Sequence, residues 1–343
     1  MIGLGPMARA RHRLRAVALR IGFVSGASFG AVVAAISITA RLHGQSPRPD
    51  SLRLVVVSGV TCHSLPDPAS PVAQRYHIGD VVGASKSTKG LGGRAWYFDS
   101  WRVMGISPTC WVPANVTVPF DRQHPEPGFA GVAQYVLARD TASFETLVDA
   151  ENFLLEPNHY GGGAGQSPLA TSGLLQFRRL QLIERAAMRV DAHSLEDAPV
   201  KRAWVIAHRD FLYFYEPDAM WFVANERYWK LYDANRTAPW SDELAAYASQ
   251  RVPPSDECGS DCFLSMIREG PQQYWTRLPN GPSIGRALTR ALELADHAIE
   301  AVDEEAPTRA AIDTVRSSLG LVGAPEKLAL LDRLARLDRA VKR

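Results

Sequence analysis

The chain of 343 residues contains none of the short signatures that mark common enzyme classes. It has no His-Glu-x-x-His sequence, which excludes zinc proteases of that type, and no Gly-x-Ser-x-Gly sequence, which excludes the serine hydrolases that use this turn. The nine histidines are scattered, and none has a spacing to a cysteine that predicts a catalytic pair. We therefore expect a non-enzymatic protein with no metal and no cofactor.

A phosphate-binding loop is also missing. The glycine-rich stretch at 160–167 reads YGGGAGQS, but Gln166 occupies the position where such a loop needs lysine, and no apolar strand precedes it. Pro157 ends the helical pattern before this stretch. Residues 156–172 are therefore predicted to be a loop.

Acidic residues are absent from the first 40 positions, which contain five arginines. Subtracting these five from the 38 Lys and Arg leaves 33 basic residues against 36 acidic ones, so the net charge of +2 comes from the N-terminus. The rest of the chain shows no excess of basic residues. We accordingly expect no nucleic-acid partner.

The arginines precede an uncharged run from Ile21 to Ala40, the layout of an export signal. Residues 1–40 are predicted to be a signal peptide. An uncleaved N-terminal membrane anchor is the alternative, because a helix of this length would cross a bilayer, and it would be the chain's only membrane contact. Without an Arg-Arg pair or a cysteine at its end, the leader favours neither twin-arginine export nor lipidation. Residues 41–51, with two prolines, are typical of a linker.

Only four cysteines are present. Cys258 and Cys262 are one residue too far apart for a Cys-x-x-Cys redox motif, and a zinc site would need two further ligands that the neighbouring sequence lacks. In an exported protein this spacing favours a local disulfide. Free thiols and a metal or redox site remain alternatives.

Residues 52–120 contain short runs rich in β-branched and aromatic residues, separated by prolines and glycines. This pattern predicts about five short strands, which at this size usually curl into a small barrel that closes its own edges. Residues 121–130 follow as a second linker.

The module at 52–120 resembles a bacterial SH3-like (SH3b) domain. The matching residues are Pro66, Pro71-Val72, Ile78-Gly79-Asp80-Val81-Val82, Trp101-Arg102-Val103 and Trp111-Val112-Pro113. The chain departs from the family at its usual opening, which here reads Cys62-His63-Ser64-Leu65-Pro66, and at Cys110, which replaces a glycine.

The resemblance implies a module that binds peptidoglycan or an envelope protein or peptide. Its candidate groove residues are Trp96, Tyr97, Trp101 and Trp111, although each could instead fill the small core. The barrel would bring Cys62 and Cys110 together, so a disulfide is expected there, with two free buried cysteines as the alternative.

From residue 131 to 343 the apolar period changes to about 3.6, which predicts an all-α domain, either a bundle or an irregular repeat. Two helix–turn–helix units, around Tyr228-Trp229 and Tyr274-Trp275, resemble degenerate tetratricopeptide hairpins. The aromatics at 200–278 are expected mainly between helices, with a ligand cage as the alternative.

The leading hypothesis is an exported protein of the periplasm, cell envelope or extracellular space. In it a multidomain β + α architecture combines an SH3-like binding module with a helical scaffold. The alternative is a muramidase-like cell-wall hydrolase. For that function Glu226, near Trp221 and Trp229, is the candidate catalytic acid. A further alternative is partner binding by the helices alone.

Overall fold

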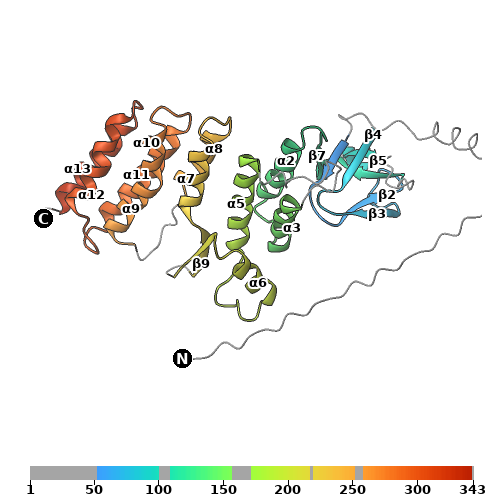
Figure 1. Cartoon of the computed structure of the whole chain (residues 1–343), viewed down its shortest axis with the longest axis horizontal. Helices are drawn as coiled ribbons and strands as arrows, with labels where there is room; N and C mark the ends of the chain where they lie inside the picture. The colour runs from blue at the N-terminus through green and yellow to red at the C-terminus, as the bar shows by residue number, and fades with distance from the viewer. Residues whose placement is uncertain (1–51, 100–108, 157–170, 217–218, 252–257, 342–343) are drawn as a thin grey trace, which may run out of the picture. The chain divides into compact units, whose positions relative to one another are not determined.

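The computed structural model describes residues 52–99, 109–156, 171–216, 219–251 and 258–341 (Figure 1). The chain divides into two units, Met1–Ser46 and Pro47–Arg343, and every described residue belongs to the second. The expected leader, its linker and the glycine-rich stretch at 160–167 lie outside the described residues. Among the described residues, no helix is long and apolar enough to cross a membrane.

The N-terminal part is an antiparallel sheet of seven strands. In chain order they are β1 (Leu52–Val55), β2 (Val60–His63), β3 (Val72–Tyr76), β4 (Val81–Lys89), β5 (Ala95–Asp99), β6 (Cys110–Pro113) and β7 (Thr117–Pro119), with 3-10 turns η2 (Leu91–Gly93) and η3 (Ala114–Val116). Their spatial order is β3-β2-β6-β5-β4-β1-β7.

The sheet does not close into the predicted barrel, because β3 and β7 remain at its two edges. Helix α2 (Glu126–Leu137) packs along β1 and β7, so this end of the sheet is covered by a helix instead of by another strand. Residues 126–130, expected in a linker, form the start of α2. Pro127 is tolerated there because an amide in the first turn needs no intrahelical acceptor.

Both predicted cysteine pairs lie at disulfide distance. Cys62 and Cys110 join β2 to β6 inside the sheet, with Cα atoms 5.5 Å apart. Closing a loop with a sequence separation of 48 stabilises the fold by about 4 kcal/mol in the chain-entropy model. A bond between Cys258 and Cys262, at a sequence separation of 4, contributes about half of that stabilisation.

The helical part contains the following elements: α3 (Phe144–Leu155), α5 (Gly173–Ala187), α6 (Pro199–Ala207), α7 (Asn225–Ala234), α8 (Ser241–Ser249), α9 (Ser260–Glu269), α10 (Pro271–Arg277), α11 (Ile284–Glu300), α12 (Arg309–Ser318), the 3-10 turn η4 (Leu319–Leu321) and α13 (Lys327–Val341). The sequence indicated a wholly α-helical region. The structure corrects this, because β8 (Leu212–Tyr215) and β9 (Met220–Val223) pair as an antiparallel hairpin between α6 and α7.

One apolar core runs from the sheet into the helices. It joins Leu52, Leu54 and Phe120 to residues of α2, α3, α5, α7 and α8. A second core holds α9 to α13 together, and it includes Leu330, Leu334 and Leu337 of α13. The aromatics Tyr228, Trp229, Tyr274 and Trp275 are all buried, as expected for packing between helices.

Candidate functional site

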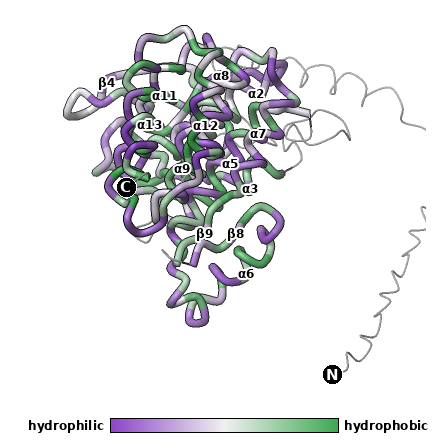
Figure 2. Tube along the Cα trace, turned by 90° about the vertical axis from the view of Figure 1, so that its left-hand side faces the viewer, coloured by the Kyte–Doolittle hydropathy of each residue, from purple (hydrophilic) through white to green (hydrophobic). Residues whose placement is uncertain are grey.

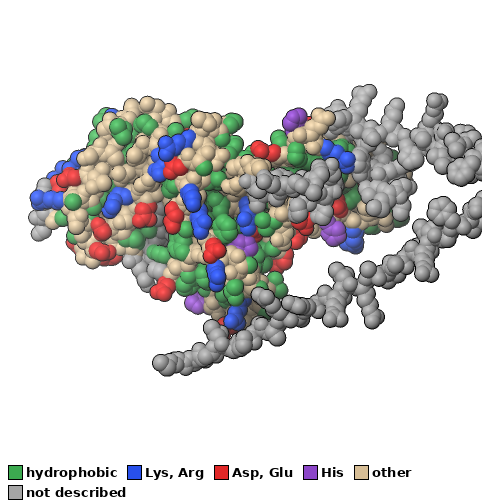
Figure 3. All heavy atoms as spheres, in the orientation of Figure 1, with side chains coloured by type: hydrophobic (Ala, Val, Ile, Leu, Met, Phe, Trp, Pro, Cys, Tyr) green, Lys and Arg blue, Asp and Glu red, His purple; other side chains and the backbone are tan. Residues whose placement is uncertain are grey.

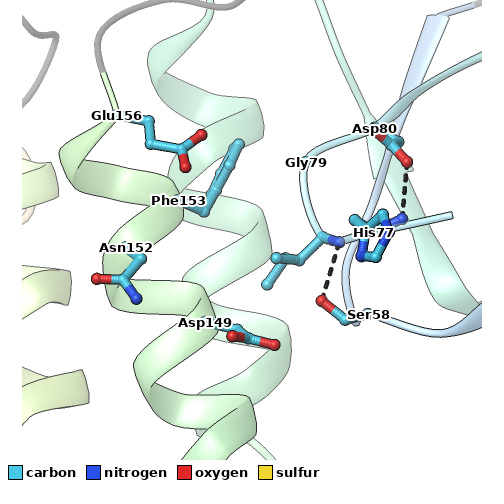
Figure 4. Close-up of a pocket in the computed structure, with 9 residues that line it drawn as sticks. Ser58, His77, Gly79, Asp80, Asp149, Asn152, Phe153 and Glu156 are labelled. Carbon is cyan, nitrogen blue, oxygen red and sulfur yellow. Dashed lines mark hydrogen bonds between the residues drawn. The ribbon is translucent and has the colours of Figure 1, made fainter.

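A pocket of about 460 Å³ lies between the turn that joins β3 to β4 and the outer side of α3 (Figure 4). The sheet contributes Ser58, His77, Ile78, Gly79 and Asp80, and α3 with its C-cap contributes Asp149, Asn152, Phe153 and Glu156. In the sequence, residues 78–82 stood out only through their family resemblance, and the exposed side of α3 carried no functional signal.

The turn at 77–80 is fixed by hydrogen bonds to its surroundings. The Asp80 carboxylate accepts from the backbone N–H of His77 at 2.7 Å, and Ser58 Oγ accepts from the N–H of Ile78 at 3.3 Å (Figure 4). Two backbone hydrogen bonds connect the turn to Val55. The Gly79 N–H donates to the Val55 carbonyl at 2.8 Å, and the Val55 N–H donates to the Asp80 carbonyl at 2.9 Å. This wall of the pocket is therefore preorganised.

Gly79 and Phe153 form the contact between the two walls. Gly79 has φ of +86°, a conformation that only glycine adopts without strain. A Cβ on this residue would overlap the Phe153 ring, so glycine is needed for space as well. On its other side Phe153 meets Phe129 of α2 edge-to-face at 5.1 Å. The ring is thus held between the turn and α2.

The pocket is predominantly acidic. Asp80, Asp149 and Glu156 contribute three carboxyl groups to the lining, and His77 is the only basic side chain among the described lining residues. In Figure 4 the carboxylates of Asp149 and Glu156 lie on the side of α3 that faces the turn. Carboxylates around an aromatic ring favour a ligand with a positively charged amine, which can form ion pairs and contact the ring face.

The opposite side of α3 is held by a buried charge cluster. Glu151 accepts hydrogen bonds from Arg179 Nε of α5 at 3.0 Å and from His208 Nε2 at 2.8 Å. His208 Nδ1 lies 2.8 Å from the Trp204 carbonyl, which can only accept, so Nδ1 carries a proton. With Nε2 directed at a carboxylate, a ring that donates from both nitrogens satisfies both partners, so this environment favours the cationic imidazolium.

Burial alone would lower the pKa of His208, but the hydrogen bond to Glu151 and its negative charge outweigh this and raise the pKa above its ordinary value. The carboxylate is 1% exposed, so it needs these partners. Since Glu151 lies between Asp149 and Phe153 in sequence, the cluster fixes the helix that forms one wall of the pocket.

A second buried carboxylate, that of Glu184 in α5, is bonded to side chains of other elements. Its Oε2 accepts from Tyr228 at 2.8 Å and from Tyr247 at 2.9 Å, and it forms an ion pair with Arg251. Burial raises the pKa of Tyr247 to about 12 and lowers that of Arg251 to about 9. The carboxylate is fully engaged, so we assign it to joining α5, α7 and α8.

The three predicted groove aromatics that the structure describes do not form one groove. Trp96 is 0% exposed, which corrects its assignment as a ligand-contacting residue: it packs against His63 at 5.8 Å. Tyr97 pairs with Val112, so it lies on the opposite face of the sheet from Trp111. Trp101 lies outside the described residues.

Each of the two remaining groove aromatics has a partner. Tyr97 contacts the Arg53 guanidinium at 4.5 Å, and Trp111 meets Phe98, which the sequence pattern did not indicate, at 5.0 Å.

Glu226, the candidate acid of the hydrolase alternative, is an exposed residue in the first turn of α7. It is not among the residues that line the acidic pocket. An exposed carboxyl group lacks the buried, apolar surroundings that a catalytic acid requires. The position of Glu226 therefore offers no argument for lytic activity.

No protein-family model matches the chain, and neither curated proteins nor solved structures gave a match. The site must therefore be understood from its own geometry.

We expect Gly79→Ala to destabilise the protein by about 1–3 kcal/mol through backbone strain, with a further loss because the new Cβ displaces Phe153. Gly59→Ala is the matched control, since Gly59 has a similar φ of +82° but no atom within 4 Å of the place that a Cβ would occupy. Urea unfolding of both variants measures the difference. Equal losses would contradict a tight contact between the turn and α3.

The raised pKa of His208 predicts that stability depends on pH. The stability that protonated His208 contributes should be fully present below pH about 6.5, the ordinary pKa of histidine. It should be lost as the pH rises through the higher pKa of His208 in the folded state. His208→Gln should remove this part of the dependence. The free energy of unfolding of both proteins, measured from pH about 6 to about 9, provides the test. A wild-type stability that rises over this range relative to the variant would refute the imidazolium assignment.

Proposed function

We propose that the protein is a non-enzymatic binding protein of an oxidising, extracytoplasmic compartment. Its acidic pocket would bind an amine-bearing peptide group of peptidoglycan. The pocket carries this proposal, because it combines three carboxylates with one aromatic ring between two fixed walls. Its carboxyl groups line an open and polar surface, unlike the desolvated glutamate that glycoside hydrolysis uses as its acid.

The disulfides support the proposed location. Two cysteine pairs at bonding distance account for all four cysteines, which is typical of proteins that fold in an oxidising environment. The periplasm or cell envelope is the more specific proposal, and it rests on the signal-like residues 1–40.

The choice of peptidoglycan rests on ligand chemistry and on the SH3b resemblance. Free amines on the stem peptides of a cell wall would complement Asp149 and Glu156. The pocket lies at the β3–β4 turn, and this turn is the Ile78-Gly79-Asp80 segment on which the resemblance depends. One wall of the proposed ligand site thus belongs to the module for which the resemblance implies wall binding, and α3 with its C-cap supplies the other wall.

The test is a pull-down of the chain from Pro47 onward on purified peptidoglycan, before and after acetylation of the free amines of the wall. We expect acetylation to reduce binding. Asp149→Asn should weaken it by about tenfold, the loss of one charge-assisted hydrogen bond worth roughly 1.5 kcal/mol.

Glu196→Gln is the matched control, because Glu196 is exposed and lies outside the pocket lining, and the substitution changes the net charge by the same amount. The control should bind like the wild type. The proposal would be contradicted if neither acetylation nor Asp149→Asn changed the binding. The absence of any binding would contradict it as well.

A further inference from the structure

One face of the seven-stranded sheet carries a continuous row of side chains across five strands. The residues that lie opposite one another along β3, β2, β6, β5 and β4 are Val72, His63, Trp111, Phe98 and Lys86. Directly opposed residues of an antiparallel pair place their side chains on the same face. These five residues therefore share one surface, which we call the aromatic face.

Contacts between the side chains agree with this register. The Phe98 and Trp111 rings are 5.0 Å apart, and the Lys86 ammonium lies 5.8 Å from the centre of the Phe98 ring. Both rings are half-buried and Lys86 is exposed. The apolar core of this part of the sheet, which includes Val112, lies on the opposite face. The two rings are thus open to a ligand on the outside of the sheet.

The aromatic face is positively charged. Arg75 is exposed and pairs with Thr61, whose hydroxyl lies 2.8 Å from His63 Nε2, so Arg75 belongs to the same face. Within the part of the chain that the structure describes, neither Arg75 nor Lys86 forms a salt bridge. Figure 2 shows β4, the strand of Lys86, extending to the edge of the view with hydrophilic residues toward its end.

The described residues of β2 to β6 and their connections include three acids, and none is free to neutralise these cations. Asp99 is 1% exposed on the opposite face, where its carboxylate accepts from a backbone N–H at 2.9 Å. Asp80 belongs to the acidic pocket, and Asp67 accepts a backbone N–H within its own turn at 2.9 Å. Figure 3 shows acidic side chains gathered over α3, beside the sheet. The aromatic face therefore favours an anionic ligand.

We propose that the aromatic face binds an acidic polysaccharide, a chain of sugars that carry carboxylates. A sugar ring would stack on Trp111 and Phe98, and its carboxylate would pair with Lys86 beside these rings. Arg75 would pair with a further carboxylate along the chain. The site shares no residue with the acidic pocket, so the inference does not depend on the proposed function.

Strand pairing argues against an extended peptide as the ligand. Such a peptide gains affinity from main-chain hydrogen bonds to a free strand edge, but β2, β6, β5 and β4 are each paired on both sides. A single-stranded nucleic acid could stack on the rings, but the two cysteine pairs at disulfide distance indicate an oxidising compartment. A polysaccharide needs only the ring faces and a few polar side chains.

The test is affinity electrophoresis of the full chain in gels that contain polygalacturonate, whose sugar units each carry a carboxylate. The matched ligand is the same polymer after reduction of its carboxylates to alcohols, which keeps the sugar rings and removes the charge. Poly-glutamate supplies charge without rings, and oligothymidylate represents nucleic acid. We expect polygalacturonate alone to retard the protein, and added salt to weaken this effect.

Lys86→Gln should lower the affinity about tenfold, as expected for the loss of one charge-assisted contact. Lys89→Gln is the matched control, because Lys89 is an exposed lysine of the same strand that pairs with Ala95 and lies on the opposite face. Phe98→Ala should also weaken binding about tenfold, whereas Tyr97→Ala, on the opposite face of the same strand, should not. Both lysines are exposed, so their comparison tests the face even if a ring substitution prevents folding.

Several results would overturn the inference. Equal retardation by the reduced polymer would exclude a charge-dependent site, and equal losses in Lys86→Gln and Lys89→Gln would indicate attraction to the overall charge only. Poly-glutamate or oligothymidylate that retards the protein as strongly would identify an acidic peptide or a nucleic acid as the occupant. The absence of retardation by polygalacturonate would overturn it as well. Asp149→Asn, which tests the acidic pocket, should leave the retardation unchanged, and a loss would place the polymer there instead.

Discussion

The contact between the β3–β4 turn and α3 is the interaction on which the rest of the structure depends. Gly79 lets the turn approach the Phe153 ring, and Phe129 holds that ring from the other side. The sheet and the first helices thereby share one apolar core, which includes Leu54 of β1 and Leu147 of α3. The seven-stranded sheet is therefore not a module attached by a linker: one of its faces is completed by helices.

Buried charges then fix the orientation of the helices. Glu151 and Glu184 would each be costly to bury alone, and each is satisfied by partners from other elements. Such groups restrict how helices pack, because a shift in register would leave a carboxylate without its donors. We infer that these clusters specify the arrangement of α3, α5, α7 and α8, while apolar burial provides most of the stability.

Local patterns in the sequence predicted the features that depend on local chemistry. The strand-rich character of 52–120 and both cysteine pairs at disulfide distance were predicted correctly, although the structure has seven strands in an open sheet instead of about five in a barrel. The hairpin at 212–223 was missed because short apolar runs fit a helix as well as a strand. The pocket could not be predicted, since Asp149 alone is indistinguishable from an ordinary charge on a helix surface. It becomes part of a site only where α3 meets the turn.

The most direct test of the shared core is native-state hydrogen exchange on the chain from Pro47 onward. We expect the slowest amides of β1, such as Leu54, and of α3, such as Leu147, to exchange with the same opening free energy, because each element loses its apolar partners when the other unfolds. Both values should fall together in Gly79→Ala. A sheet that opens and closes while α3 stays protected would contradict the account and restore the picture of an independent β module.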